Sequence, residues 1–142
     1  MRWAFDDGGR AAAGYKGRTG DCGVRALAIA EHLPYQEAVE IVSHYAEDER
    51  LTRRRPKRSA VRTGIRRSTM RKILADRGWV WFPIMGIGTG CKVHMVSSEL
   101  PGGTLIVSLS RHYAAVVDGV LHDTFDCTRR GTRCVYGYWW KP

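Results

Sequence analysis

The sequence predicts an α+β fold in which N-terminal helices pack against a C-terminal antiparallel β-sheet. Between residues 22 and 77, apolar residues recur at helical spacing in three stretches. Between residues 104 and 125, three short apolar runs are typical of strands, and Asp118-Gly119 separates the last two. This dipeptide indicates a two-residue hairpin loop, because both central residues of a type I′ turn need positive φ. A chain of 142 residues with 44% apolar content suits one domain over residues 1–142.

Composition and charge exclude several classes of protein. No run approaches the ~20 apolar residues of a membrane span, and the N-terminus lacks the apolar core of a signal peptide. We therefore expect a cytoplasmic protein with no membrane partner and four reduced cysteines. Residues 50–77 carry a local excess of eleven basic groups, while the remaining residues sum to −2 of the net +9. The sequence thus predicts a near-neutral domain with one basic insertion at about residues 50–67.

The first predicted helix, from about Cys22 to His32, begins at a cysteine. Val24, Leu27 and Ala28 form its apolar face. A cysteine at this end lies beside unpaired backbone N–H groups and the positive end of the helix dipole, which favour the thiolate. Cys22 is therefore a candidate nucleophile.

The predicted hairpin of residues 112–117 and 120–125 supplies a candidate base. A two-residue loop pairs Val117 with Val120 and continues so that His112 and Asp123 share one face. Asp126 projects the other way. A histidine oriented by a carboxylate on the neighbouring strand is the second half of a cysteine-nucleophile site.

These two stretches carry a resemblance to a known superfamily. Residues 21–27, Asp-Cys-Gly-Val-Arg-Ala-Leu, resemble the Asp-Cys-Gly-x-x-Ala-Leu motif of papain-like peptidases that cleave double-glycine leader peptides. Residues 112–117 with Asp123 are similar to the His-strand-hairpin-Asp element of that group, and small phage and bacterial papain-like proteins carry a similar pair. The resemblance implies a papain-like fold, a Cys22-His112-Asp123 triad and, for a phage protein, a location in the host cytoplasm.

The sequence departs from the papain-like pattern at the oxyanion hole. A glutamine usually stands six residues before the cysteine, and here that position is Lys16. The oxyanion donors predicted instead are the backbone N–H of Cys22 and, as the second candidate, Thr19. Losing one oxyanion donor costs roughly 100- to 1000-fold in rate.

Two further helices and several strands are predicted around these two stretches. A second helix is predicted over Tyr35–Glu47, and a third over Thr69–Arg77 with Ser68 as its N-cap. Strands are predicted at residues 79–82, ending before a proline, and at 135–140. Residues 1–20 indicate a loop with one short strand.

The basic run has two possible interpretations. One is a solvated loop that is extended or mobile, because like charges repel and no apolar face is available. The other is a patch that contacts phosphates or an acidic protein. The side chains expected to make such contacts are Arg53, Arg54, Arg55, Lys57 and Arg58.

The remaining cysteines and glycines indicate no further site. Cys91-Lys92-Val93-His94 has the spacing of half a zinc site, but the second half could come only from Cys127 and Cys134 or from His122, too spread for structural zinc. We therefore expect no metal. Cys127 and Cys134 could form a disulfide if oxidised, although free thiols are expected. The glycines of residues 86–90 predict a flexible loop that crosses near the site and could close over a substrate.

Two functions are compatible with these observations. The first is a thiol hydrolase acting on a protein or peptide, needing no cofactor, in which Cys22 attacks an acyl carbon, His112 transfers protons and Asp123 orients the ring. Hydrolysis and acyl transfer remain open. The alternative is a non-catalytic binding module on the same fold, whose arginine-rich loop contacts nucleic acid or an acidic protein.

Overall fold

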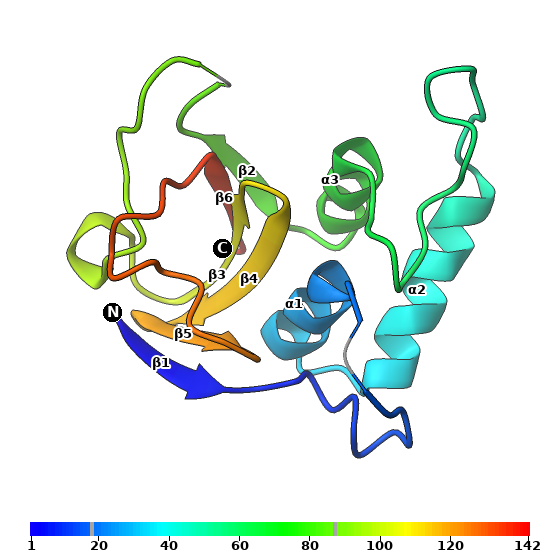
Figure 1. Cartoon of the computed structure of the whole chain (residues 1–142), viewed down its shortest axis with the longest axis horizontal. Coiled ribbons are helices and arrows are strands. Elements are labelled where there is room, and N and C mark those ends of the chain that lie inside the picture. Colours follow the sequence, from blue (N-terminus) through cyan, green and yellow to red (C-terminus); the bar gives the residue numbers. More distant parts are fainter. Residues whose placement is uncertain (18, 87) are drawn as a thin grey trace.

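Three helices and a six-stranded sheet make up the described part of the chain, which is therefore α+β as predicted (Figure 1). The computed structural model describes residues 1–17, 19–86 and 88–142. In chain order the elements are β1 (Arg2–Phe5), α1 (Cys22–Glu31), α2 (Tyr35–Glu47), α3 (Arg67–Asp76), β2 (Val80–Pro83), a 3₁₀ turn (Ser97–Glu99), β3 (Thr104–Leu109), β4 (His112–Val117), β5 (Val120–Asp123) and β6 (Gly137–Trp140). No helix among these is long and apolar enough to cross a membrane.

The strands lie in the order β1-β5-β4-β3-β6-β2. Every neighbouring pair is antiparallel except β1 and β5, which are parallel. The expectation of a wholly antiparallel sheet is therefore wrong at this edge. The short strand expected in residues 1–20 is present, and it joins the sheet beside a strand more than a hundred residues later. The edge strand β2 includes Pro83, which the sheet tolerates because β2 pairs only with β6.

The β4–β5 hairpin has the predicted register. Val117 pairs with Val120 and Val116 with Leu121. The two turn residues, Asp118 and Gly119, have φ values of 48° and 78°, as a type I′ turn requires. The start of β4 and the end of β5 therefore lie on neighbouring strands, which brings His112 and Asp123 together.

The sheet separates two apolar cores. On one face the helices cover it, with Leu27, Ile73 and Ile106 among the buried contacts. On the other face lie the long segments that precede β3 and β6 (Figure 1), with Met95 and Leu121 in that core. The central strand β3 is buried on both faces, which explains its largely apolar sequence.

The third helix begins earlier than predicted and without the predicted cap. It starts at Arg67, and Ser68 lies inside it rather than at its N-cap. The N-cap residue is Arg66, whose backbone N–H donates to Ser59 Oγ at 2.9 Å. A hydroxyl from the basic insertion thus satisfies a backbone N–H at the N-cap of this helix.

The cysteines do not pair as expected. Cys91 and Cys134 form a disulfide across 43 residues, while Cys22 and Cys127 are free. Neither the expectation of four free thiols nor the alternative Cys127–Cys134 pairing is correct. Segments 93–95 and 133–135 lie side by side through backbone hydrogen bonds, which sequence spacing does not reveal.

Candidate active site

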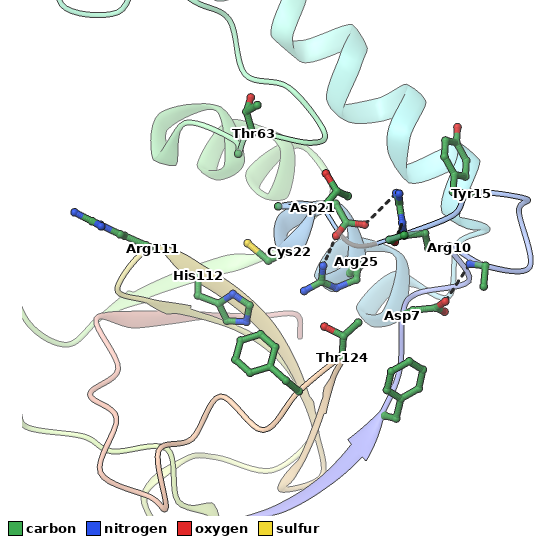
Figure 2. A pocket seen from close by; sticks show the side chains of 17 residues that line it. Asp7, Arg10, Tyr15, Asp21, Cys22, Arg25, Thr63, Arg111, His112 and Thr124 are labelled. Carbon is green, nitrogen blue, oxygen red and sulfur yellow. Dashed lines mark hydrogen bonds and ion pairs between the residues drawn. The ribbon is translucent and has the colours of Figure 1, made fainter.

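Cys22 is the first residue of α1 and lies at the wall of a cavity (Figure 2). Its thiol is partly buried, and Figure 2 shows Cys22 and His112 as neighbours at the edge of the cavity. Burial by itself would raise the pKa of the thiol. Hydrogen bonding and charge from His112, a backbone hydrogen bond from Tyr113 and the charge of Arg25 outweigh burial and lower the pKa. The site therefore favours the thiolate.

His112 and Asp123 form a close buried pair. His112 Nε2 lies 2.6 Å from Asp123 Oδ2, and the two side chains are 9% and 2% exposed. Because Asp123 engages Nε2, the other ring nitrogen, Nδ1, remains for the thiol. Burial by itself would lower the pKa of His112. Hydrogen bonding with Asp123, Cys127 and Cys22 outweighs burial and raises this pKa to about 11. Burial likewise opposes ionisation of Asp123, but the bond from His112 keeps the pKa of its carboxyl lowered.

The second oxygen of Asp123 is held by an arginine that the sequence analysis did not single out. Arg25 Nη2 donates to Asp123 Oδ1 at 3.1 Å, and Arg25 Nη1 pairs with Asp21 Oδ1. All three side chains are at most 8% exposed. Arg25 thus links the turn before Cys22 to the carboxylate behind His112. The i,i+4 spacing of Asp21, the N-cap residue of α1, and Arg25 in its first turns is the sequence signal for half of this link.

Two further buried polar groups complete the network. Tyr35 donates its hydroxyl to Asp21 Oδ2 at 2.7 Å, and Arg10 Nη1 donates to that hydroxyl at 2.9 Å. Burial and the neighbouring carboxylate of Asp21 raise the pKa of Tyr35 to about 12, so it remains a donor. Figure 2 shows Arg10, Asp21 and Arg25 converging at the start of α1. The network holds the cysteine end of the helix against the N-terminal loop.

The cavity beside Cys22 has a volume of about 600 Å³. Its walls come from the N-terminal segment, the start of α1, residues 63–64 of the basic insertion, the start of β4 and the segment that follows β5. The lining residues are Phe5, Asp7, Arg10, Ala11, Tyr15, Gly17, Thr19, Gly20, Asp21, Cys22, Arg25, Thr63, Gly64, Arg111, His112, Thr124 and Phe125. Its size suits an extended peptide or a comparable small group.

The two candidate oxyanion donors have different surroundings. Cys22, as the first helical residue, has a backbone N–H with no intrahelical partner. Thr19 lines the cavity, but its hydroxyl donates to the carbonyl of Arg62 at 3.4 Å. Lys16, six residues before Cys22, is exposed and does not line the cavity. The oxyanion role of Thr19 remains a prediction.

The basic insertion is anchored at its base, contrary to the expectation of a run with nothing to pack against. Arg66 donates to the carbonyl oxygens of Arg50, Arg55 and Lys57, and Glu49 accepts hydrogen bonds from Ser59. The five basic side chains predicted to contact a partner are exposed, and none lines the cavity. They are Arg53, Arg54, Arg55, Lys57 and Arg58.

Two other expectations about the surroundings of the site need correction. None of the described residues of the glycine loop 85–90 lines the cavity, so this loop is not the predicted cover. Thr63 and Gly64 of the basic insertion lie there instead. Cys127, which received no role from the sequence, is buried within 4.8 Å of the ligand atoms of His112 and Asp123. Its hydrogen bond contributes to the raised pKa of His112.

No protein-family model, curated protein or solved structure matches this chain.

Proposed function

We propose that this protein is a cysteine hydrolase of papain-like fold that cleaves amide or isopeptide bonds. One observation carries the proposal: a thiol with a lowered pKa at a helix N-terminus lies beside a histidine that is held by a buried carboxylate at 2.6 Å. The same three residue types in this order carry the resemblance to papain-like peptidases. The cavity beside them offers room for a substrate chain.

The reaction follows from these positions. The Cys22 thiolate attacks the acyl carbon, and the protonated ring of His112 gives its proton to the departing amine, leaving a thioester. Water then attacks the thioester while His112 takes a proton, which releases the acid and restores the thiolate. Asp123 fixes the ring orientation throughout and stabilises its positive charge. An amine in place of water gives acyl transfer.

Selective alkylation tests the nucleophile. In non-reducing buffer only Cys22 and Cys127 are free, so iodoacetamide followed by mass spectrometry compares the two directly. We expect carbamidomethylation of Cys22 near neutral pH, well below the pKa of about 8.5 of a free thiol. Cys127, 1% exposed, is the internal control and should react far more slowly. Labelling of Cys22 that begins only near pH 8.5 would remove the basis of the proposal.

Trapping of the acyl-enzyme tests the reaction itself. A library of peptide amides incubated with the protein and hydroxylamine should yield peptide hydroxamates, because hydroxylamine captures a thioester. Cys22→Ala should abolish these products while leaving the circular dichroism spectrum unchanged. Hydroxamates formed equally by the variant would show that Cys22 is not the nucleophile.

The exposed arginines favour a second candidate function, a binding module for nucleic acid or an acidic protein. Arg53, Arg54 and Arg55 project to solvent, as phosphate-contacting groups must. If they bind a polyanion, affinity for single-stranded nucleic acid should fall steeply with salt, and replacing all three by glutamine should reduce the slope of log K against log salt by about two units. Salt-dependent binding without rapid alkylation of Cys22 would favour this module over the enzyme.

A further inference from the structure

A cluster of metal-binding side chains lies outside the cavity beside Cys22. The donor atoms of Cys91, His94 and Cys134 all lie within 4.8 Å of one another, and none of these residues lines that cavity. Cys91 and His94 come from the loop before the 3₁₀ turn, and Cys134 from the segment before β6. Two sulfurs and one imidazole are a donor set that Zn²⁺ prefers.

Backbone hydrogen bonds hold the two segments together independently of the disulfide. Met95 N–H donates to the carbonyl of Arg133 at 2.9 Å, and Val135 N–H donates to the carbonyl of Val93 at 2.8 Å. His94 and Cys134 face each other in the resulting antiparallel bridge. Met95 and Val135 are fully buried, which fixes both segments to the core. The donor atoms therefore remain near one another when the sulfurs are reduced.

The surroundings of His94 suit a metal ligand. Glu99 Oε1 lies 3.3 Å from Nδ1 of the ring. A carboxylate there holds a proton on Nδ1, leaves the lone pair of Nε2 for a metal and fixes the ring orientation. Cys91 is exposed, so solvent can reach the cluster and complete a tetrahedral shell.

We propose that the reduced protein binds Zn²⁺ through Cys91, His94 and Cys134, and that the disulfide and the metal are alternative states of one site. A thiol reductant opens the disulfide: its thiolate attacks the Cys91 sulfur and releases the Cys134 thiolate, and a second reductant thiol then frees Cys91 as its own disulfide. Two electrons pass from the reductant to the protein. Zn²⁺ then binds the two sulfurs as thiolates and displaces their protons.

Metal loading of the full chain tests the proposal. Protein reduced with a phosphine, loaded with ZnCl₂ and desalted should retain one zinc per chain, and untreated disulfide protein should retain none. X-ray absorption of the zinc form should show two sulfur neighbours at about 2.3 Å and a nitrogen at about 2.0–2.1 Å. Substitution with Co²⁺ should give a thiolate charge-transfer band in the near ultraviolet.

Variants at matched positions decide where the metal binds. Cys91→Ser and Cys134→Ser should lose stoichiometric zinc, whereas Cys22→Ser and Cys127→Ser should keep it. Glu99→Gln should weaken binding about 10- to 100-fold in competition with a chromophoric chelator. Because Cys91 is exposed, its serine variant should fold, which circular dichroism verifies.

Two results would overturn the proposal. Reduced wild-type protein that retains no zinc would exclude the site. Zinc kept by Cys91→Ser but lost by Cys127→Ser would assign the metal to the His112, Asp123 and Cys127 cluster instead. These readouts measure metal alone, so they are independent of the proposed hydrolase activity.

Discussion

Both carboxylate oxygens of Asp123 are engaged by neighbouring groups. Oδ2 holds the ring of His112 at 2.6 Å, and Oδ1 accepts hydrogen bonds from Arg25 and from the backbone N–H of Thr124. A carboxylate with both oxygens engaged in a buried site stays ionised and fixed in orientation. The orientation of His112 thus depends on α1 as well as on the hairpin.

Replacing Asp123 should move the pH at which Cys22 becomes reactive. In Asp123→Asn the amide cannot stabilise the imidazolium, so the pKa of His112 should fall. Less positive charge beside the sulfur then raises the pKa of Cys22, and the rise of alkylation rate with pH should shift upward. Asp126→Asn is the matched control, because Asp126 is exposed and bonds Thr128 instead. Equal profiles for the two variants would contradict the role given to Asp123.

Arg25 should contribute strongly to folding stability. Arg25→Met leaves the buried carboxylates of Asp21 and Asp123 without their shared cation, which costs about 3–5 kcal/mol for comparable buried pairs. Urea unfolding measures the loss. Arg111→Met, an exposed arginine at the same cavity, should change stability by less than about 0.5 kcal/mol. A small loss of stability in Arg25→Met would mean that water solvates the two carboxylates in place of the guanidinium.

At the level of elements, the contact between β2 and β6 depends on a residue without a side chain. A Cβ at Gly137 would lie 2.7 Å from the Phe82 carbonyl oxygen and would collide with the ring of Trp81. The carbonyl belongs to the neighbouring strand and cannot turn away without breaking the pairing. Gly137 therefore allows the edge strand to lie against the sheet.

Gly137→Ala should destabilise the protein by about 1–3 kcal/mol, the usual cost of overpacking a core position. Gly102→Ala is the control, because its added Cβ meets nothing within 4 Å and its φ is not in the left-handed region. In thermal unfolding, the melting temperature of Gly137→Ala should lie clearly below that of Gly102→Ala. Equal melting temperatures would indicate that β2 moves without loss.

Arg66 holds the base of the basic insertion together. Arg66→Met removes the donor to three carbonyl groups of this segment. We expect faster trypsin cleavage at residues 53–58 and a stability loss of about 1–3 kcal/mol. Arg54→Met, which alters an exposed side chain, should change neither stability nor cleavage at the other basic residues. Unchanged proteolysis of Arg66→Met would show that Arg66 does not hold the segment.

For the molecule as a whole, the Cys91–Cys134 disulfide ties the segment before β3 to the segment before β6. Closing a loop across 43 residues stabilises the folded state by about 4 kcal/mol in the chain-entropy account. Cys91→Ser should lose about this amount in non-reducing buffer. In reducing buffer with a chelator, variant and wild type should unfold at the same urea concentration. A difference that persists after reduction would assign the stabilisation to packing.

Patterns among residues close together in the sequence were sufficient to predict much of the fold. The helical spacing after Cys22 and the Asp118-Gly119 turn predicted α1 and the hairpin register, because both depend on neighbours a few residues apart. The register in turn predicted that His112 and Asp123 face each other. The start of α3 was misplaced, because Ser59, rather than the local Ser68, accepts the N–H at its N-cap.

The sequence by itself determined the chemistry available: a thiol at a helix start and an imidazole and carboxylate on adjacent strands. Only the tertiary structure decided that Arg25 bridges Asp21 and Asp123, that β1 joins β5 in parallel and that Cys91 pairs with Cys134. The physical reason is distance along the chain. Periodicity and turn preference act over a few residues. The Arg25–Asp123, β1–β5 and Cys91–Cys134 contacts join residues 43 to about 120 apart, which only the packing of the whole chain brings together.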